Sequence, residues 1–133
     1  MIRILIPGVP VGKGRPRMTR TGHAYTPEKT RTYEDKIALF AHEAMGGCPP
    51  LTGHLTLNVT AIFPIPESWS KKKKISALNF EIFPGKPDCD NLLKTIDAMN
   101  SIVWRDDAQI CTATIRKMYG EVPSLLIEVE EVV

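Results

Sequence analysis

The clearest alternation of apolar and polar residues in this chain lies at positions 54–63. The apolar members occupy every second position: Leu55, Leu57, Val59, Ala61 and Phe63. Successive side chains of a β-strand point to opposite faces, so this pattern predicts a strand with one buried face. Apolar runs at residues 2–9, 109–119 and 124–132, each next to Pro or Gly, predict further strands.

Apolar residues recur at helical spacing in two other segments. The first segment begins at Thr26, expected as the N-cap, continues through Pro27 in the first turn, and ends at Gly46 and Gly47. The second covers residues 91–100, and its apolar stripe consists of Leu92, Leu93, Ile96 and Met99. Strands on both sides of helices, without strict alternation of the two, predict an α+β fold with an antiparallel or mixed sheet.

Length and composition narrow the class of protein. A chain of 133 residues fits one domain, so we expect a single domain over residues 1–133. Its apolar runs are too short for a membrane span, and its first residues lack a signal-peptide pattern. The cysteines at 48, 89 and 111 form no C-x-x-C motif, and a core of this size needs no disulfides. These features favour a cytoplasmic protein without a membrane partner.

The net charge is only +2, but basic and acidic residues are concentrated in separate segments of the chain. Residues 11–25 lack periodicity and predict a long basic loop, a type of segment that is usually functional or disordered. Residues 68–78 permit a helix and contain the tetra-lysine run 71–74, whereas residues 121–133 are acidic and contain no Lys or Arg. Separated blocks of this kind predict a basic face for a polyanion, although solvated loops would give the same pattern.

A group of charged residues precedes and enters the second helical segment. A helical projection places Asp90, Lys94 and Asp97 on one narrow face, opposite the apolar stripe. Pro87 favours extended backbone before the helix, where Asp88 can point to the same side as Asp90. Convergent carboxylates are typical Mg²⁺ ligands, and a nearby lysine can stabilise a phosphoryl oxygen. The same residues would also serve as a helix N-cap and a surface ion pair.

Two adjacent carboxylates, Asp106 and Asp107, precede the strand expected to begin at Gln109. Neighbouring residues on a strand point to opposite faces, so at most one of the two is expected to join Asp88 and Asp90. On local grounds alone, a turn is the better explanation of this pair.

Several motifs together carry a family resemblance. The central ones are Lys86-Pro87-Asp88-x-Asp90-Asn91-Leu92-x-Lys94, then Asp97-Ala98, then Asp106-Asp107-x-Gln109-Ile110. They are accompanied by Pro7-Gly8-x-Pro10-x-x-Lys13-Gly14-Arg15-Pro16-Arg17 and by Pro66-x-Ser68-Trp69-Ser70-Lys71-Lys72-Lys73. In this order and spacing, the motifs resemble those of the RusA family of Holliday junction resolvases, along most of the chain.

The resemblance implies a homodimeric endonuclease, dependent on Mg²⁺ or Mn²⁺, that resolves four-way DNA junctions by paired symmetric nicks in recombination and repair. Asp88, Asp90 and Asp107 match the metal-site carboxylates of that family, and Lys94 matches its essential lysine. The roles of Asp97 and Asp106 stay open. No small-molecule cofactor is expected, and an origin in a prophage or a bacterium fits the resemblance.

The expected DNA contacts are basic side chains that bind phosphates: Lys13, Arg15, Arg17, Arg20, Lys71, Lys72, Lys73, Lys74 and Lys86. Some RusA-like proteins have a basic residue where this chain has Pro87, so a contact there must come from Lys86 or another cation. The histidines at 23, 42 and 54 are scattered, and we expect them to be structural or surface residues.

Two rival functions remain open from the sequence. In a non-catalytic, structure-specific DNA-binding module, the acids would only cap a helix and a turn. That protein would bind DNA tightly in a salt-sensitive way without cleaving it. A Mg²⁺-dependent phosphoesterase for small substrates would leave the basic loop and the lysine run without a purpose.

Overall fold

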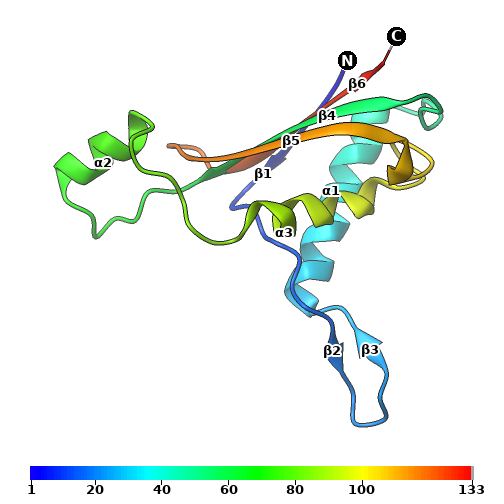
Figure 1. The fold of residues 1–133 in the computed structure, drawn as a ribbon, viewed down its shortest axis with the longest axis horizontal. Coiled ribbons are helices and arrows are strands. Elements are labelled where there is room, and N and C mark those ends of the chain that lie inside the picture. The colour runs from blue at the N-terminus through cyan, green and yellow to red at the C-terminus, as the bar shows by residue number, and fades with distance from the viewer. Residues whose placement is uncertain (133) are drawn as a thin grey trace.

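A four-stranded mixed sheet forms the centre of the fold (Figure 1). The computed structural model describes residues 1–132. In the order β1-β6-β4-β5, the sheet consists of β1 (Ile2–Pro7), β6 (Ser124–Glu131), β4 (Leu55–Phe63) and β5 (Ile110–Tyr119). Strand β6 is antiparallel to both of its neighbours, whereas β4 and β5 are parallel. The predicted α+β class with a mixed sheet is confirmed.

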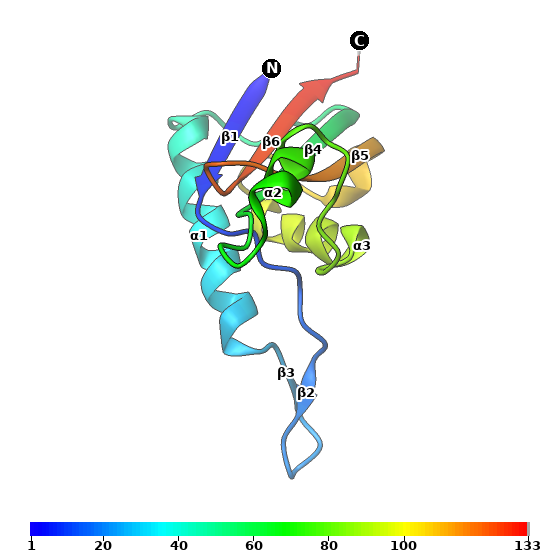
Figure 2. The ribbon, with the colours of Figure 1, turned by 90° about the vertical axis from the view of Figure 1, so that its left-hand side faces the viewer.

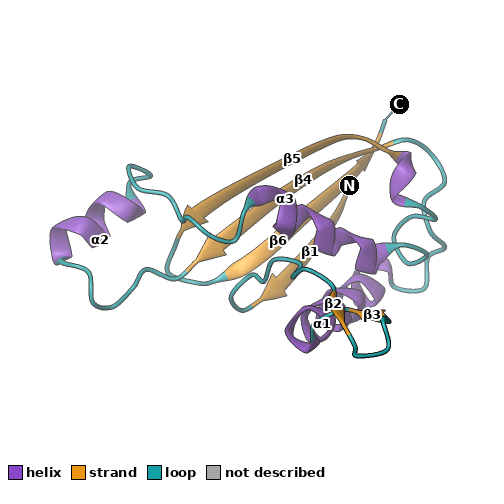
Figure 3. Cartoon of the chain, turned by 60° about the horizontal axis from the view of Figure 1, so that its bottom comes forward, coloured by secondary structure: helices purple, strands orange, loops and turns teal. Residues whose placement is uncertain are grey.

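The core lies between one face of this sheet and the helices (Figure 3). The alternation predicted for β4 is confirmed, because its apolar positions are buried and Val59 pairs in register with Ile127 of β6. Helix α1 (Glu28–Met45) contributes Tyr33, Ile37 and Ala41 to the same core. Burying such an aliphatic side chain contributes roughly 1.5–3 kcal/mol, so this shared core fixes α1 against the sheet.

Helix α1 begins later than the sequence suggested. Its N-cap residue is Pro27, in extended backbone, and no side chain caps the first turn. The prediction of Thr26 as the N-cap was therefore wrong. The predicted end is confirmed, since Gly46 adopts the left-handed conformation at φ 56° and its N–H donates to the carbonyl of His42.

The segment expected to be an irregular loop contains a small hairpin. Strands β2 (Arg17–Met18) and β3 (Ala24–Tyr25) pair antiparallel and project away from the sheet (Figures 1 and 2). The side chain of Thr19 accepts a hydrogen bond from the His23 N–H within the turn. We call residues 17–25 the β2–β3 hairpin, and all of them are exposed.

A second projection carries the tetra-lysine run. Helix α2 (Lys71–Leu78) is capped at its N-terminus by Ser70, whose hydroxyl accepts a hydrogen bond from the Lys73 N–H at 3.2 Å. We call residues 64–86 the α2 arm; it extends beyond the end of the sheet (Figure 1). The helix expected within residues 68–78 is therefore present. None of the helices described for residues 1–132 has the length and apolar character to cross a membrane.

The charged motif lies on helix α3 (Cys89–Leu93), which continues as the 3₁₀ helix η1 (Lys94–Met99). The predicted helix 91–100 thus begins two residues earlier, and its N-cap residue is Asp88 rather than Asp90. The apolar stripe is confirmed, with Leu92, Ile96 and Met99 buried in the core. Thr95 is also buried, and its hydroxyl donates to the Leu92 carbonyl, which satisfies that polar group.

Candidate active site

Asp88 and Asp90 stand at the exposed start of α3. Asp88 has extended backbone, as the preceding proline predicted, and its side chain makes no capping hydrogen bond to the helix. Asp90 is in the first turn, with its carboxylate Oδ2 3.8 Å from the Lys94 Nζ. Because both side chains of this ion pair are more than half exposed, it contributes little to stability. Of the predicted face of Asp90, Lys94 and Asp97, the pairing of Asp90 with Lys94 is present, and both groups are accessible to a ligand. Asp97 instead pairs with Lys13.

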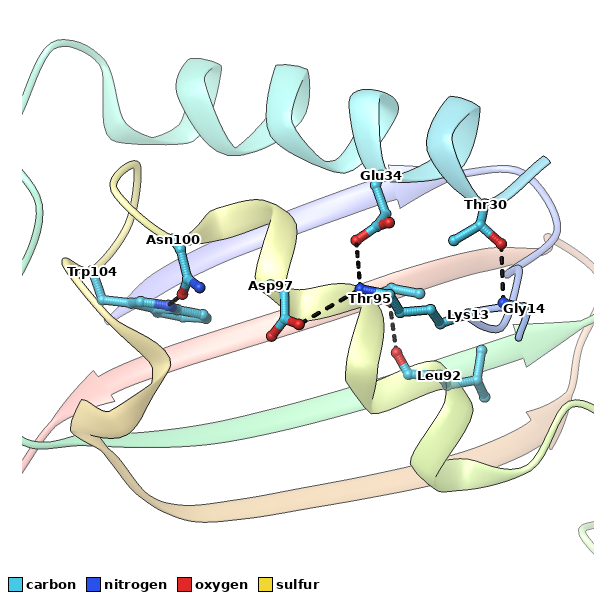
Figure 4. A network of polar contacts seen from close by, with 9 residues as sticks. All are labelled: Lys13, Gly14, Thr30, Glu34, Leu92, Thr95, Asp97, Asn100 and Trp104. Carbon is cyan, nitrogen blue, oxygen red and sulfur yellow. Dashed lines mark hydrogen bonds and ion pairs between the residues drawn. The ribbon is translucent and has the colours of Figure 1, made fainter. Parts of the chain in front are cut away.

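Asp97, on η1, faces the Asp107 carboxyl and Lys13 of the N-terminal segment. Its Oδ2 lies 3.6 Å from the Nζ of Lys13, which is also 3.6 Å from the Oε2 of Glu34 on α1 (Figure 4). The structure therefore places Lys13, expected as a phosphate contact, in a part-buried bridge between two elements. Arranged in this way, Lys13 joins the N-terminal segment to α1 and η1.

Asp107 lies beside Asp97 and Asp106. A hydrogen bond shared with the Asp97 carboxyl, followed by one shared with Asp106, raises the pKa of Asp107 to about 6. This rise is the expected result when carboxylates sit close together and share a hydrogen bond. Asp107 belongs to the 3₁₀ helix η2 (Asp107–Gln109) and not to the strand, so the argument from opposite strand faces does not apply to it.

Asp106 caps the 3₁₀ helix η2, in agreement with the turn that the sequence indicated at this position. Its side chain accepts from the Ala108 N–H, and Gln109 accepts in return from the Asp106 N–H, which forms a capping box. The Ala108 N–H is the main reason that the pKa of Asp106 is lowered. The turn interpretation therefore holds for Asp106. Strand β5 begins at Ile110 rather than Gln109 for the same reason.

The N-terminal segment packs directly against the start of α3. The Lys13 N–H donates to the Asn91 carbonyl at 2.8 Å, and the Gly14 N–H donates to the Thr30 hydroxyl at 3.0 Å (Figure 4). At Gly12, an added Cβ would lie 2.7 Å from the Cβ of Pro87, so only glycine permits this approach. A cleft of about 240 Å³ beside this contact is lined by Lys13, Gly14, Arg15, Pro16, Asn91 and Lys94.

Two positioning residues were missed by sequence reasoning. The Lys117 ammonium donates to the carbonyls of Gly85 and Pro87, which holds the backbone that leads into Asp88. The Gln109 amide donates to the carbonyls of Leu51 and Gly53, both at 2.9 Å, and so fixes the turn that carries Asp107. The sequence held one sign of this role for Lys117. In the predicted strand, Lys117 shares its face with the apolar residues Ile115 and Tyr119, where a charged residue is unusual.

The three proposed metal ligands do not form one closed cluster. Within residues 1–132, no three His, Cys, Asp or Glu side chains lie close enough together to hold a metal ion. Asp107 contacts Asp97 and Asp106, whereas Asp88 and Asp90 stand at the start of α3. The oxygen donors nonetheless suit Mg²⁺, which is usually held by one or two carboxylates together with water and substrate phosphates.

The basic side chains lie on both projections. Arg15, Arg17 and Arg20 are exposed, and none of them forms an ion pair within the described residues 1–132. Lys71, Lys72 and Lys86 are exposed in the α2 arm, whereas Lys74 is half-buried. Lys73 is different, because its Nζ lies 4.0 Å from the centroid of the Trp69 ring. The histidines are all at the surface, and the three cysteines are free thiols.

Accessible carboxylates and a lysine, flanked by cations without partners, are the groups with which nucleases hold a metal ion and a nucleic-acid phosphate. These groups suit a small nuclease. Residues 7–130 match the family described as Endodeoxyribonuclease RusA. The chain is also 34% identical over 138 residues to a Bacillus subtilis (strain 168) protein, YqaN, described as uncharacterized. That match covers 98% of this chain and 96% of its relative. This chain belongs to the RusA endodeoxyribonuclease family, whose members act on branched DNA junctions.

Proposed function

We propose that this protein is a Mg²⁺-dependent endonuclease that resolves four-way DNA junctions by paired symmetric nicks. The observation that carries the proposal is the pair Asp90 and Lys94, exposed beside the free Asp88 carboxylate at the start of α3. The membership of the family supports cleavage of branched DNA. In this proposal residues 1–133 act as one cytoplasmic endonuclease domain.

Asp88 and Asp90 would hold the metal ion at the start of α3 together with water and the substrate phosphate, with Mn²⁺ as a substitute for Mg²⁺. Asp107 would be the third carboxylate of the site, and it would have to approach the other two when DNA and metal bind. When bound, the ion lowers the pKa of a coordinated water and offsets negative charge in the transition state. Asp90 orients the Lys94 ammonium, which binds a non-bridging oxygen of the scissile phosphate as charge develops there. Asp97 acts as a positioning residue, since it contacts both Lys13 and the carboxyl of Asp107.

The basic projections would bind the arms of the junction through phosphates. The β2–β3 hairpin lies on one side of α3 and the α2 arm on the other (Figure 1). Such contacts give strong, salt-dependent affinity with little sequence information. Some RusA-like proteins have a basic residue at the position of Pro87. In this chain Lys86, the preceding residue, is exposed and would make that DNA contact instead.

We further propose a homodimer as the active species. Two copies related by a two-fold axis would place two acidic sites on opposite strands of a four-way junction. Two coordinated nicks at symmetric positions would then separate the junction into two duplexes.

The test is cleavage of a labelled synthetic four-way junction, with linear duplex alongside, in Mg²⁺ and in EDTA. Wild type should give paired symmetric nicks in Mg²⁺ alone, and Asp90→Asn should give none while still binding the junction. Asp35→Asn is the matched control, because Asp35 is an exposed acid on α1 outside the site. Tight junction binding without cleavage in either Mg²⁺ or Mn²⁺ would instead establish the non-catalytic binding module.

A further inference from the structure

The α2 arm exposes more large apolar side chains than its attachment to the sheet requires. Ile75, Leu78, Phe80 and Phe83 are 50%, 39%, 57% and 57% exposed. Phe80 and Phe83 follow the helix, close in sequence to the lysine run. Exposed apolar side chains that gather in one segment, rimmed by polar residues, mark a binding surface.

Phe80 adopts the left-handed backbone conformation, which glycine adopts more readily than any other residue. Its φ is 60°, and its N–H donates to the Ala77 carbonyl at 3.2 Å. The Glu81 N–H donates to the Ser76 carbonyl at 3.0 Å, which completes the usual C-terminal motif of a helix. Glycine occupies this left-handed position in most helices, and a bulky side chain there is strained. Since the Phe80 ring is exposed, packing within the chain does not offset that strain.

The arm is anchored on its other side, so its exposed rings have a defined direction. Trp69 packs edge-to-face on Tyr119 of β5 with ring centroids 5.2 Å apart. Lys73 covers the Trp69 ring, and Ala77 of the same helix is fully buried. Positions 73 and 77 share one face of α2, whereas Lys71, Ile75 and Leu78 share the face turned away from this anchor.

We propose that Phe80 and Phe83 stack on unstacked bases of branched DNA, while Lys71, Lys72 and Lys74 bind the neighbouring phosphates. Aromatic rings next to cations are the groups that bind single-stranded nucleic acid, because every base offers a stacking face. The inference rests on the proposed function, since a four-way junction supplies exposed base faces at its branch point. It assigns recognition of the branch to the α2 arm.

Charge favours DNA over a second copy of the chain as the occupant of this surface. In a symmetric contact between two α2 arms, each of the two surfaces would carry the same excess of lysine over acidic residues. Like charges facing each other oppose such an interface, whereas a polyanion neutralises them. The strained Phe80 also suits stacking, since the ring is held outward at the end of a capped helix.

The experiment measures affinity by fluorescence anisotropy for a four-way junction, for an oligo-dT strand and for linear duplex. Phe80→Gly and Phe83→Ala should each weaken binding to the junction and to oligo-dT by about tenfold, the usual effect of losing one stacked base. Binding to linear duplex and the salt dependence should stay unchanged, since the lysines remain. Phe80→Trp keeps an aromatic ring, so this variant should bind the junction and oligo-dT with about wild-type affinity.

Phe80→Gly also carries an internal control, because glycine relieves the backbone strain. Its melting temperature should equal or exceed that of wild type, so weaker binding would not reflect unfolding. Leu39→Ala is the matched surface control, since Leu39 on α1 is also 57% exposed. It should leave all three affinities unchanged.

Two results would overturn the inference. The first is wild-type affinity of Phe80→Gly and Phe83→Ala for both junction and oligo-dT. The second is conversion of a wild-type dimer into a monomer by these substitutions in sedimentation, which would make the surface an interface between copies. Failure of the proposed function is a separate outcome: wild type would not cleave the junction, yet binding of oligo-dT would still depend on Phe80.

Discussion

The β2–β3 hairpin and the α2 arm are both basic projections, yet they differ in how they are held. The hairpin is a pair of two-residue strands with hydrogen bonds inside its turn, and every side chain in it is exposed. The α2 arm is fixed to β5 through Trp69 and buries Ala77. The hairpin therefore offers cations and two exposed apolar side chains, Met18 and Tyr25, on a short two-stranded ribbon. The arm offers cations and apolar groups on a segment that is anchored to the sheet. In the proposed function, two projections of similar charge would thus bind DNA in different ways.

Substitutions at Lys94 in the candidate active site should affect cleavage and junction binding to different degrees. Lys94→Met removes the cation that faces the scissile phosphate, so turnover should fall by on the order of 10²–10³, the usual effect of losing one transition-state contact. Junction affinity should fall far less, because both basic projections remain. Single-turnover cleavage with saturating protein measures the first effect, and anisotropy measures the second.

Lys72→Met is the control for that substitution, since Lys72 is an exposed lysine of the α2 arm. It should weaken binding slightly and leave single-turnover cleavage intact. Equal losses of binding and turnover in Lys94→Met would assign Lys94 to DNA binding rather than to the chemical step.

The two projections can be compared by removing the cations of each. The triple variants Arg15/Arg17/Arg20→Ala and Lys71/Lys72/Lys74→Ala should both make the salt dependence of binding shallower, by about 0.9 in the log–log slope for each lost phosphate contact. The lysine variant should keep its preference for junction over duplex, because Phe80 and Phe83 remain. A salt dependence unchanged from wild type in either variant would show that this projection does not touch DNA.

The contact between the N-terminal segment and α3 should depend on glycine at position 12. Gly12→Ala places a Cβ 2.7 Å from that of Pro87, so the backbones must separate, at a cost of about 1–3 kcal/mol in the free energy of unfolding. Denaturant unfolding measures this loss, and cleavage should fall with it. Gly53→Ala, where an added Cβ meets nothing within 4 Å, should be close to neutral.

The smallest effect concerns the carboxyl pair of Asp97 and Asp107. Without metal, Asp107→Asn removes charge repulsion that contributes less than about 1 kcal/mol at this partly exposed site, and should raise the melting temperature by about 2–4 °C at pH 7–8. The pKa of Asp107 is raised from 3.8 to about 6, so protonation stabilises folded wild type at low pH. The advantage of the variant should thus disappear as the pH falls from about 6 to about 4. Scans in EDTA test this, and lower stability of Asp107→Asn would contradict it.

The parts of the molecule with strong local patterns could be predicted from the sequence. The alternation at residues 54–63 identified β4, and the apolar stripe of Leu92, Ile96 and Met99 identified the buried side of α3 and η1. Both features depend only on the spacing of neighbours in the chain. The pairing of Asp90 with Lys94 follows from the same helical spacing.

The contacts that arrange the site could not be predicted, because they join segments distant in sequence. Lys13 was expected at a phosphate, yet it bridges Glu34 and Asp97 from two different elements. The closeness of Asp97 and Asp107 depends on the 3₁₀ geometry of η1 and η2, which no periodicity in the sequence indicated. Lys117 reaches two backbone carbonyls before Asp88, and only the sheet register places it there.

The α2 arm leaves and rejoins the fold at nearly the same place. It departs after Phe63, which pairs in register with Tyr119, and returns at Gly85 and Pro87, whose carbonyls bind Lys117 two residues away on the same strand. Segments with adjacent ends can be shortened, extended or exchanged without disturbing the elements on either side. The arm is therefore a module that evolution or an engineer can alter while the carboxylates and Lys94 stay as they are; in the proposed function, such changes would alter which DNA structures are recognised.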